Sequence, residues 1–195
     1  MHEQNPTPNP IDLVSTWLTD ADDHPLHGGV TLATVGPDGR PSARIVLLRG
    51  HDERGFVFYT NYRSRKAEEL QTNPQAAMVL WWRDLKQQVR IEGRVNKVSR
   101  EESEVYFASR PRGHQLGAWV SKQSRVIPDR AVLNDGLTET RRRFENRDIP
   151  CPPHWGGYRL SPDMIEFWEE GEHRLHDRLR YRRQDGEWRI ERLAP

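Results

Sequence analysis

The sequence is poor in cysteine and in long apolar stretches. Cys151 is the only cysteine among 195 residues, which excludes an intrachain disulfide and a metal site built from cysteines. Only 34% of the residues are hydrophobic, and the longest apolar run, 76–82, has strand length rather than the ~18–20 residues that cross a bilayer. Residues 1–10 lack the basic and apolar regions of a signal peptide. We therefore expect a soluble, cytoplasmic protein without a membrane partner.

The sequence also lacks a charge excess. Its 30 Lys and Arg residues face 29 Asp and Glu residues, which leaves a formal net charge of +1. A general polyanion binder depends on a large positive excess, and the recognition sequence of an RNA-binding RRM sheet is absent, so we expect no nucleic-acid partner. Of the 30 basic residues, 26 are Arg. Arg suits sites where a planar fork holds carboxylate or phosphate, although genomic composition explains such a bias equally well.

The apolar pattern predicts one β-rich domain with helices inserted in its middle. Residues 1–10 hold three prolines and predict a disordered arm, 11–195 predict a single domain, and 22–29 read as a polar linker. Strands that come in hairpin-like pairs favour an antiparallel barrel with helices packed at its side over a parallel βαβ sheet. The predicted strands are 30–35, 42–49, 55–60, 76–82, 87–98, 157–160, 164–168, 178–183 and 187–192, and the predicted helices are 11–21, 64–73, the segment after a capping box at 99–102, 112–120 and 129–147.

Several familiar catalytic and binding motifs are missing. The sequence contains neither GxxxxGK[ST] nor GxGxxG, so both common phosphate-binding loops are absent. It has no HExxH and no GxSxG nucleophile elbow. His173 and His176 stand three residues apart without an evident third ligand, so we expect no metal site.

Four short segments combine basic residues with hydroxyl or aromatic residues at the ends of predicted elements. They are 44–49, 59–66, 106–114 and 174–178. Ordinary structural roles explain the basic residues in three of these segments. The first segment fits a strand with solvated ends, the third a helix C-terminus, and the fourth a strand edge whose charges prevent pairing with another strand. The second places Arg65 and Lys66 at a helix N-terminus, where the helix dipole disfavours cations unless an anion lies among them. We therefore predict a phosphate site there.

Taken together and in this order, these segments resemble the pyridoxamine 5′-phosphate oxidase family, FMN enzymes of vitamin B6 metabolism. The resemblance implies an FMN-binding split β-barrel, Greek-key-like and antiparallel, in a homodimer with FMN at the subunit interface. It also implies oxidation of pyridoxamine or pyridoxine 5′-phosphate to pyridoxal 5′-phosphate, with O2 as acceptor and H2O2 as product. The matching segments are RIVLLR (44–49), FVFYTNYRSRK (56–66), QVRIEGRV (88–95), YFASRPRGHQLGAW (106–119), PPHWGGYRL (152–160), IEFW (165–168), RLHDRLRY (174–181) and WRIERLAP (188–195).

Carried onto this chain, the resemblance implies two sets of site residues. Those that contact FMN are Arg44, Ile45, Val46, Leu47, Leu48, Arg49, Tyr59, Thr60, Arg65, Lys66, Gln88, Gln123, Ser124, Trp168 and Arg178. Those that bind the phosphate substrate are Arg49, Tyr106, Arg110, His114, Arg174, Leu175 and His176. Among them, Arg174 and His176 would be catalytic, and we expect them to alternate along an extended segment over the substrate ring. Tyr106 and Arg110 are about one helical turn apart and would share a face toward the substrate phosphate.

The chain departs from the family pattern at two of these positions. The pattern has Lys where this chain has Arg49, and Ser where it has His114. Arg49 keeps the charge but changes its geometry, while His114 replaces a small hydroxyl group with a ring. Because both positions address the substrate phosphate, we expect an altered substrate pocket. Two other functions stay open: a related flavin oxidase of another reduced ring compound, such as a phenazine precursor, and a non-catalytic flavin-binding protein.

Overall fold

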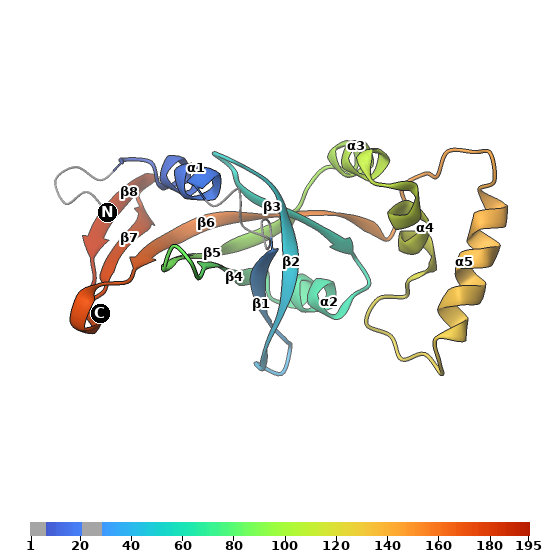
Figure 1. Cartoon of the computed structure of the whole chain (residues 1–195), viewed down its shortest axis with the longest axis horizontal. Coiled ribbons are helices and arrows are strands. Elements are labelled where there is room, and N and C mark those ends of the chain that lie inside the picture. Colours follow the sequence, from blue (N-terminus) through green and yellow to red (C-terminus); the bar gives the residue numbers. More distant parts are fainter. Residues whose placement is uncertain (1–6, 21–28) are drawn as a thin grey trace.

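The strands form one antiparallel sheet that closes into a barrel. The computed structural model describes residues 7–20 and 29–195, in which the sheet has the order β3-β2-β1-β4-β5-β6-β7-β8. An additional β3–β6 pairing closes six strands into the predicted antiparallel barrel, while β7 and β8 extend from β6 (Figure 1). The strands are β1 (Gly29–Val35), β2 (Pro41–Asp52), β3 (Gly55–Asn61), β4 (Gln75–Trp82), β5 (Gln87–Lys97), β6 (Trp155–Glu169), β7 (Asp177–Gln184) and β8 (Glu187–Arg192).

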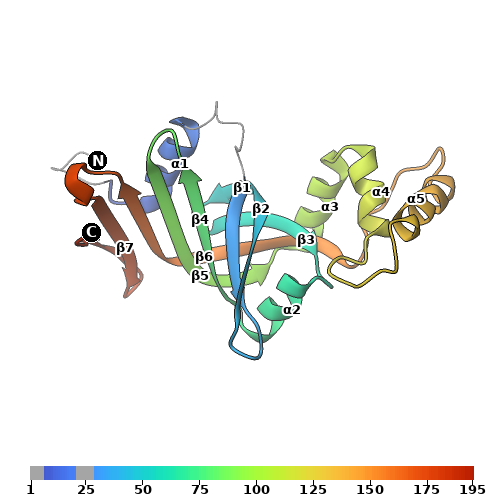
Figure 2. The same ribbon diagram turned by 60° about the horizontal axis from the view of Figure 1, so that its bottom comes forward.

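Most of the helices lie at one end of the molecule. Three of them, α3 to α5, lie together beyond one end of the barrel, and β7 and β8 lie toward the opposite end (Figures 1 and 2). Within the described ranges, no helix is long and apolar enough to cross a bilayer. The helices are α1 (Pro10–Asp20), α2 (Arg65–Thr72), α3 (Arg100–Ser109), α4 (Arg112–Val120) and α5 (Ala131–Arg143), with a 3-10 turn η1 (Glu172–Arg174).

The barrel core follows from the alternation of apolar residues. In β5, Val89, Ile91, Gly93 and Val95 are buried, while the alternating Arg90, Glu92 and Arg94 reach the surface at least in part, as the period-two pattern predicts. Helix α1 turns one apolar face to the same core and brings the Trp17 ring to 5.2 Å from that of Phe167. Each fully buried side chain of this size contributes about 1.5–3 kcal/mol, so this face keeps α1 docked.

One strand is longer than the sequence pattern predicts. The predicted strands 157–160 and 164–168 are parts of the single strand β6, and the interpretation of a break between them is wrong. Pro162 lies in the ladder opposite Gly93, where the β5–β6 register shifts. A Cβ on Gly93 would lie only 2.1 Å from the Ser161 carbonyl oxygen, so this glycine lets the partner backbone approach. A bulge of this kind accommodates proline, which has no N–H to donate.

The described part of the N-terminal segment makes side-chain and backbone contacts with the rest of the chain. Residues 1–6 of the predicted arm and residues 22–28 of the predicted linker lie outside the described residues. Within 7–10, the Tyr181 hydroxyl donates to the Thr7 carbonyl oxygen over 2.9 Å, and Asn9 Nδ2 donates to Glu53 Oε1 over 2.9 Å. Pro10 is the first residue of α1, so fixed contacts start before residue 11.

Candidate active site

A groove of about 1170 Å³ lies where β2, β3, the N-terminus of α2 and the α3–α4 segment meet. The structure brings together here most residues that the sequence predicts for the site, although their contacts with a ligand stay a prediction. The predicted residues that line it are Arg44, Ile45, Val46, Leu47, Arg49, Tyr59, Thr60, Arg65, Lys66, Tyr106, Arg110, His114, Gln123 and Ser124. The groove therefore joins the first three of the four basic segments.

At one end of the groove, Lys66 forms a cationic position. Its side chain is 8% exposed, and Nζ donates to Thr60 Oγ1 over 3.1 Å and to Gln123 Oε1 over 3.2 Å. Burial, together with the charge of Arg44, lowers the pKa of Lys66 to about 8 although Glu69 opposes the shift. A buried ammonium group is costly without a counter-charge, so this position favours an anion.

Glu69, which the sequence did not predict as a site residue, is hydrogen-bonded to Arg44 and Arg65 at the Lys66 end of the groove. It is 4% exposed, and its carboxylate accepts hydrogen bonds from Thr34, Ser42, Arg44 and Arg65. Burial alone would raise the pKa of Glu69, but these hydrogen bonds and the charge of Arg44 outweigh it and lower the pKa to about 2. The i,i+4 spacing of Arg65 and Glu69 on a predicted helix was the available signal.

The other end of the groove has an aromatic wall. The Tyr59 and Tyr106 rings stack with centroids 3.9 Å apart, and the Trp155 ring lies 5.5 Å from that of Tyr59 at an interplanar angle of 11°. Burial raises the pKa of the Tyr59 hydroxyl to about 12, so it stays protonated at neutral pH. Trp155 was not among the predicted site residues, because nothing in its local sequence indicates that it faces the groove.

Arg110 lies against this wall with unused hydrogen-bonding capacity. Its guanidinium group sits 4.6 Å above the Trp155 ring centroid. Its Nη1 is buried and has no hydrogen-bond partner in the part of the chain that the structure describes. Burial lowers the pKa of Arg110, and the nearby charge of Arg49 adds to this shift. Because buried polar groups are nearly always paired, this nitrogen marks a second anion position in the groove.

Backbone anchors hold these side chains in place. Gln115 Nε2 donates to the carbonyl oxygens of Phe107, Ala108 and Arg110, which fixes the end of α3 where Arg110 begins its turn. Asn61 Nδ2 donates to the Ser121 carbonyl oxygen over 3.0 Å and ties the loop that carries Gln123 to β3. Both anion positions thus rest on fixed elements of the fold.

The remaining predicted site residues lie outside the groove, and all but one form a second group. Trp168 pairs with Gln88 on one side and Arg178 on the other, and its ring lies 4.6 Å from the His176 ring. Arg178 Nε donates to the buried Glu166 over 2.8 Å. Leu48 is the exception, because it packs against the barrel core. The set outside the groove is Leu48, Gln88, Trp168, Arg174, Leu175, His176 and Arg178.

The expected geometry of Arg174 and His176 is wrong. Arg174 ends the η1 turn with a φ of 63°, so the segment is not extended and simple alternation does not apply. His176 Nδ1 instead accepts a hydrogen bond from the Gly171 backbone N–H over 3.3 Å. The loop is so tight that a Cβ on Gly171 would lie only 2.0 Å from the Leu175 carbonyl oxygen. The turn leaves the Leu175 side chain 70% exposed.

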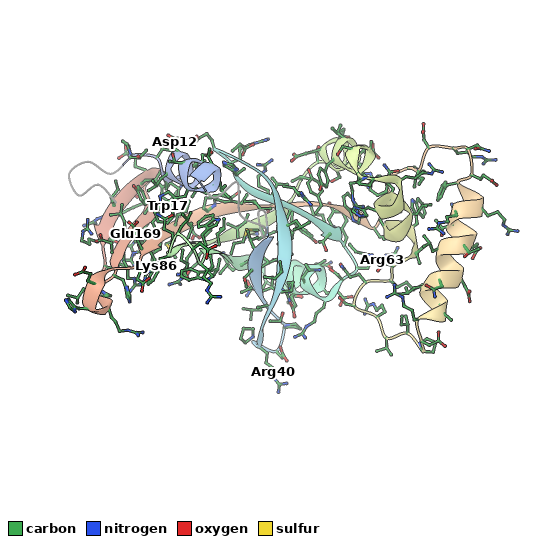
Figure 3. All side chains as sticks on the ribbon, viewed as in Figure 1. Asp12, Trp17, Arg40, Arg63, Lys86 and Glu169 are labelled. Carbon is green, nitrogen blue, oxygen red and sulfur yellow. The ribbon has the colours of Figure 1, made fainter. Side chains whose placement is uncertain are left out.

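The groove and the second group are far apart within one chain. Trp155 lies in the groove and Trp168 in the second group, and both belong to β6. Thirteen residue steps of an extended strand span roughly 40 Å. Figure 3 shows Arg63, beside the N-terminus of α2, and Glu169, at the end of β6, toward opposite ends of the molecule. A ligand that contacts both groups therefore requires a second copy of the chain.

Comparison with known proteins assigns both parts of the chain to one family. Residues 25–143 match the family model described as pyridoxamine 5′-phosphate oxidase, and residues 155–195 match the pyridoxine 5′-phosphate oxidase C-terminal dimerisation region. The pyridoxine/pyridoxamine 5′-phosphate oxidase of Acaryochloris marina is 54% identical over 96% of this chain and 86% of its own length. The oxidase of the same name from Pseudomonas paraeruginosa is 53% identical over 100% and 93%.

Two solved structures share the fold. PhzG from Burkholderia lata, solved in complex with tetrahydrophenazine-1-carboxylic acid, is 34% identical with a TM-score of 0.92 and covers 98% of this chain and 95% of its own. A pyridoxamine 5′-phosphate oxidase-related, FMN-binding protein from Nostoc punctiforme is 21% identical with a TM-score of 0.76 over 94% and 96%, which supports the fold alone. By the family models and the full-length relatives, the chain belongs to the pyridoxamine 5′-phosphate oxidase family.

Proposed function

We propose that this protein oxidises pyridoxamine or pyridoxine 5′-phosphate to pyridoxal 5′-phosphate with FMN and O2, releasing H2O2. The observation that carries the proposal is the pair of separate anion positions in one groove, at Lys66 and at Arg110. Such a pair fits a phosphorylated cofactor and a phosphorylated substrate bound side by side. The two full-length relatives described above carry the name of this activity.

The Lys66 end fits the phosphate of FMN. Its donors combine the Lys66 ammonium, the Arg65 guanidinium and the first N–H groups of α2, where a helix dipole favours an anion. Thr60 and Gln123 complete the polar lining. When bound, FMN would supply the flavin ring that accepts a hydride from the substrate carbon and that O2 then reoxidises.

The Arg110 end fits the substrate phosphate. Arg110 offers an unpaired N–H, and Arg49, His114 and Tyr106 line the same part of the groove. Arg forms short, charge-assisted hydrogen bonds with phosphate oxygens. The aromatic wall of Tyr59, Tyr106 and Trp155 lines the groove beside this position.

The complete site contains residues of two subunits. The chain carries the family's C-terminal dimerisation region, which supports a homodimer. In the site that we propose, the partner's second group faces the groove, so that Arg174 and His176 lie over the substrate ring and orient the reacting carbon. Arg174 carries hydrogen-bond donors and no acceptor atom, so its role is binding and orientation. The exposed Ile45 and Leu47 of β2 supply apolar surface that the partner covers.

The PhzG structure supports a second candidate, oxidation of a reduced phenazine precursor. The FMN-loaded protein is therefore tested with pyridoxamine 5′-phosphate, pyridoxine 5′-phosphate and a tetrahydrophenazine carboxylic acid. We expect pyridoxal 5′-phosphate and an equal amount of H2O2 from one or both phosphates. Turnover of the phenazine precursor alone would reject the B6 activity, and turnover of none of the three would indicate a flavin-binding protein without this catalysis.

A further inference from the structure

Glu69 connects three elements beneath the cationic end of the groove. It lies on α2, and its Oε2 accepts from Thr34 of β1 over 2.5 Å and from Ser42 of β2 over 2.7 Å. The other oxygen, Oε1, accepts from Arg65 Nε over 2.8 Å. Glu69 does not itself line the groove. A buried carboxylate with several donors is held in one orientation, and it holds its donors in turn.

The network leaves the two arginines with different free donors. Arg44 points its terminal nitrogens at Leu32, Thr34, Ser42 and Glu69, so its Nη atoms are used inside the protein. Arg65 uses only Nε for Glu69, and its side chain is otherwise 63% exposed in the groove. Neither Nη atom of Arg65 has a hydrogen-bond partner among the residues that the structure describes, so both can donate to an anion, and the bond to Glu69 sets their direction.

We propose that Glu69 is a positioning residue for FMN: it does not touch the cofactor, but it aims the Arg65 guanidinium group at the position of the cofactor phosphate. This inference rests on the proposed function, because it assumes that the phosphate binds at the Lys66 end. In this proposal, the hydrogen bonds from Thr34, Ser42 and Arg44 hold the Glu69 carboxylate in place. Without Glu69, the exposed Arg65 side chain would sample many orientations, and ordering it would reduce the affinity for FMN.

Charge and geometry predict opposite results when Glu69 is neutralised. Arg44, Arg65 and Lys66 carry three positive charges and Glu69 one negative charge, so Glu69→Gln makes the phosphate position more positive. If only net charge mattered, FMN would bind more tightly. If Glu69 aims Arg65, FMN binds more weakly, because an amide cannot accept all the hydrogen bonds that the carboxylate accepts.

The test is a fluorescence titration of the apo protein with FMN, which measures the dissociation constant independently of turnover. We expect Glu69→Gln to weaken FMN binding about tenfold, which corresponds to about 1.4 kcal/mol. Glu104→Gln is the matched control, because Arg100 and Glu104 form another i,i+4 pair at 2.8 Å on α3, outside the groove. This control should bind FMN like the wild type. Unchanged or tighter binding by Glu69→Gln would overturn the proposal.

A double-mutant cycle with Arg65→Ala separates positioning from a general structural role. In the Arg65→Ala background, Glu69→Gln should change FMN affinity less than about twofold, since the side chain that it aims is gone. Equal weakening in both backgrounds would refute positioning. If Glu69→Gln does not fold, Arg65→Lys tests the same point, because it keeps the charge but loses the bond from Nε and both Nη donors. We expect about tenfold weaker binding, and wild-type affinity would overturn the proposal. Failure of the wild type to bind FMN would instead reject the proposed function.

Discussion

Replacement of Arg110 by Met should separate substrate binding from the rest of the reaction. Met keeps an unbranched apolar side chain over the Trp155 ring, but it removes the charge and the unpaired Nη1. The substrate phosphate would lose a donor that has no other described partner. FMN should bind normally, because its phosphate lies at the Lys66 end of the groove.

The size of the effect follows from the loss of one hydrogen bond between charged groups. A hydrogen bond between charged groups contributes about 1.5–3 kcal/mol, and each 1.4 kcal/mol is tenfold in affinity, so KM should rise about 10- to 150-fold. An interaction made equally in the ground state and the transition state changes KM and leaves kcat nearly unchanged. Loss of the cation–π contact, ~0.5–2 kcal/mol, is offset by removal of an unpaired buried donor, ~1–3 kcal/mol, so the melting temperature should change little.

The assay is H2O2 release at varied concentrations of pyridoxamine 5′-phosphate and of unphosphorylated pyridoxamine. Arg143→Met is the control, because Arg143 also stacks on a tryptophan, 4.9 Å from the Trp119 ring centroid, but does not line the groove. We expect the rise in KM only for Arg110→Met and only with the phosphorylated substrate. A KM change below about threefold, or an equal loss with pyridoxamine, would refute the placement of the substrate phosphate.

Three further outcomes follow from the same structure. FMN affinity should fall as pH rises through about 8, because Lys66 loses its proton near that pH, and Lys66→Arg should flatten the profile between about pH 7 and pH 10. Glu166→Gln should lower the free energy of unfolding in urea by about 1–3 kcal/mol, since Glu166 is 3% exposed and holds Arg178. Gly93→Ala should destabilise the protein by a similar ~1–3 kcal/mol, whereas Gly50→Ala, whose Cβ meets no described atom within 4 Å, should not.

Local sequence patterns predicted the elements whose structure depends on near neighbours. Ser99 accepts a hydrogen bond from the Glu102 backbone N–H at the start of α3, as the capping box requires. Asp185 and Gly186 both have positive φ in the predicted hairpin turn. These features depend on residues only a few positions apart.

Contacts between distant residues account for what the sequence did not predict. In the sequence, Pro162 indicates a break between two strands. In the structure, Gly93 lies opposite it and lets the backbone approach closely, so the strand continues. The partners of Glu69 include Thr34 and Ser42, which are 35 and 27 positions away in the sequence. The stack of Arg110 on Trp155 likewise joins two segments that no local pattern relates. The site residues themselves were named by resemblance to a family, and the structure then placed them in two separate groups.

Subunit complementation tests the central claim of a two-subunit oxidase site most directly. Arg110→Met and Arg174→Met would each be inactive at low substrate concentration, and their mixture would be unfolded and refolded together with FMN. Random pairing makes about half of the dimers mixed, and each mixed dimer has one intact site of two, so H2O2 release should recover to roughly a quarter of the wild-type rate. No recovery, with both variants folded, dimeric and loaded with FMN, would contradict a site shared between subunits.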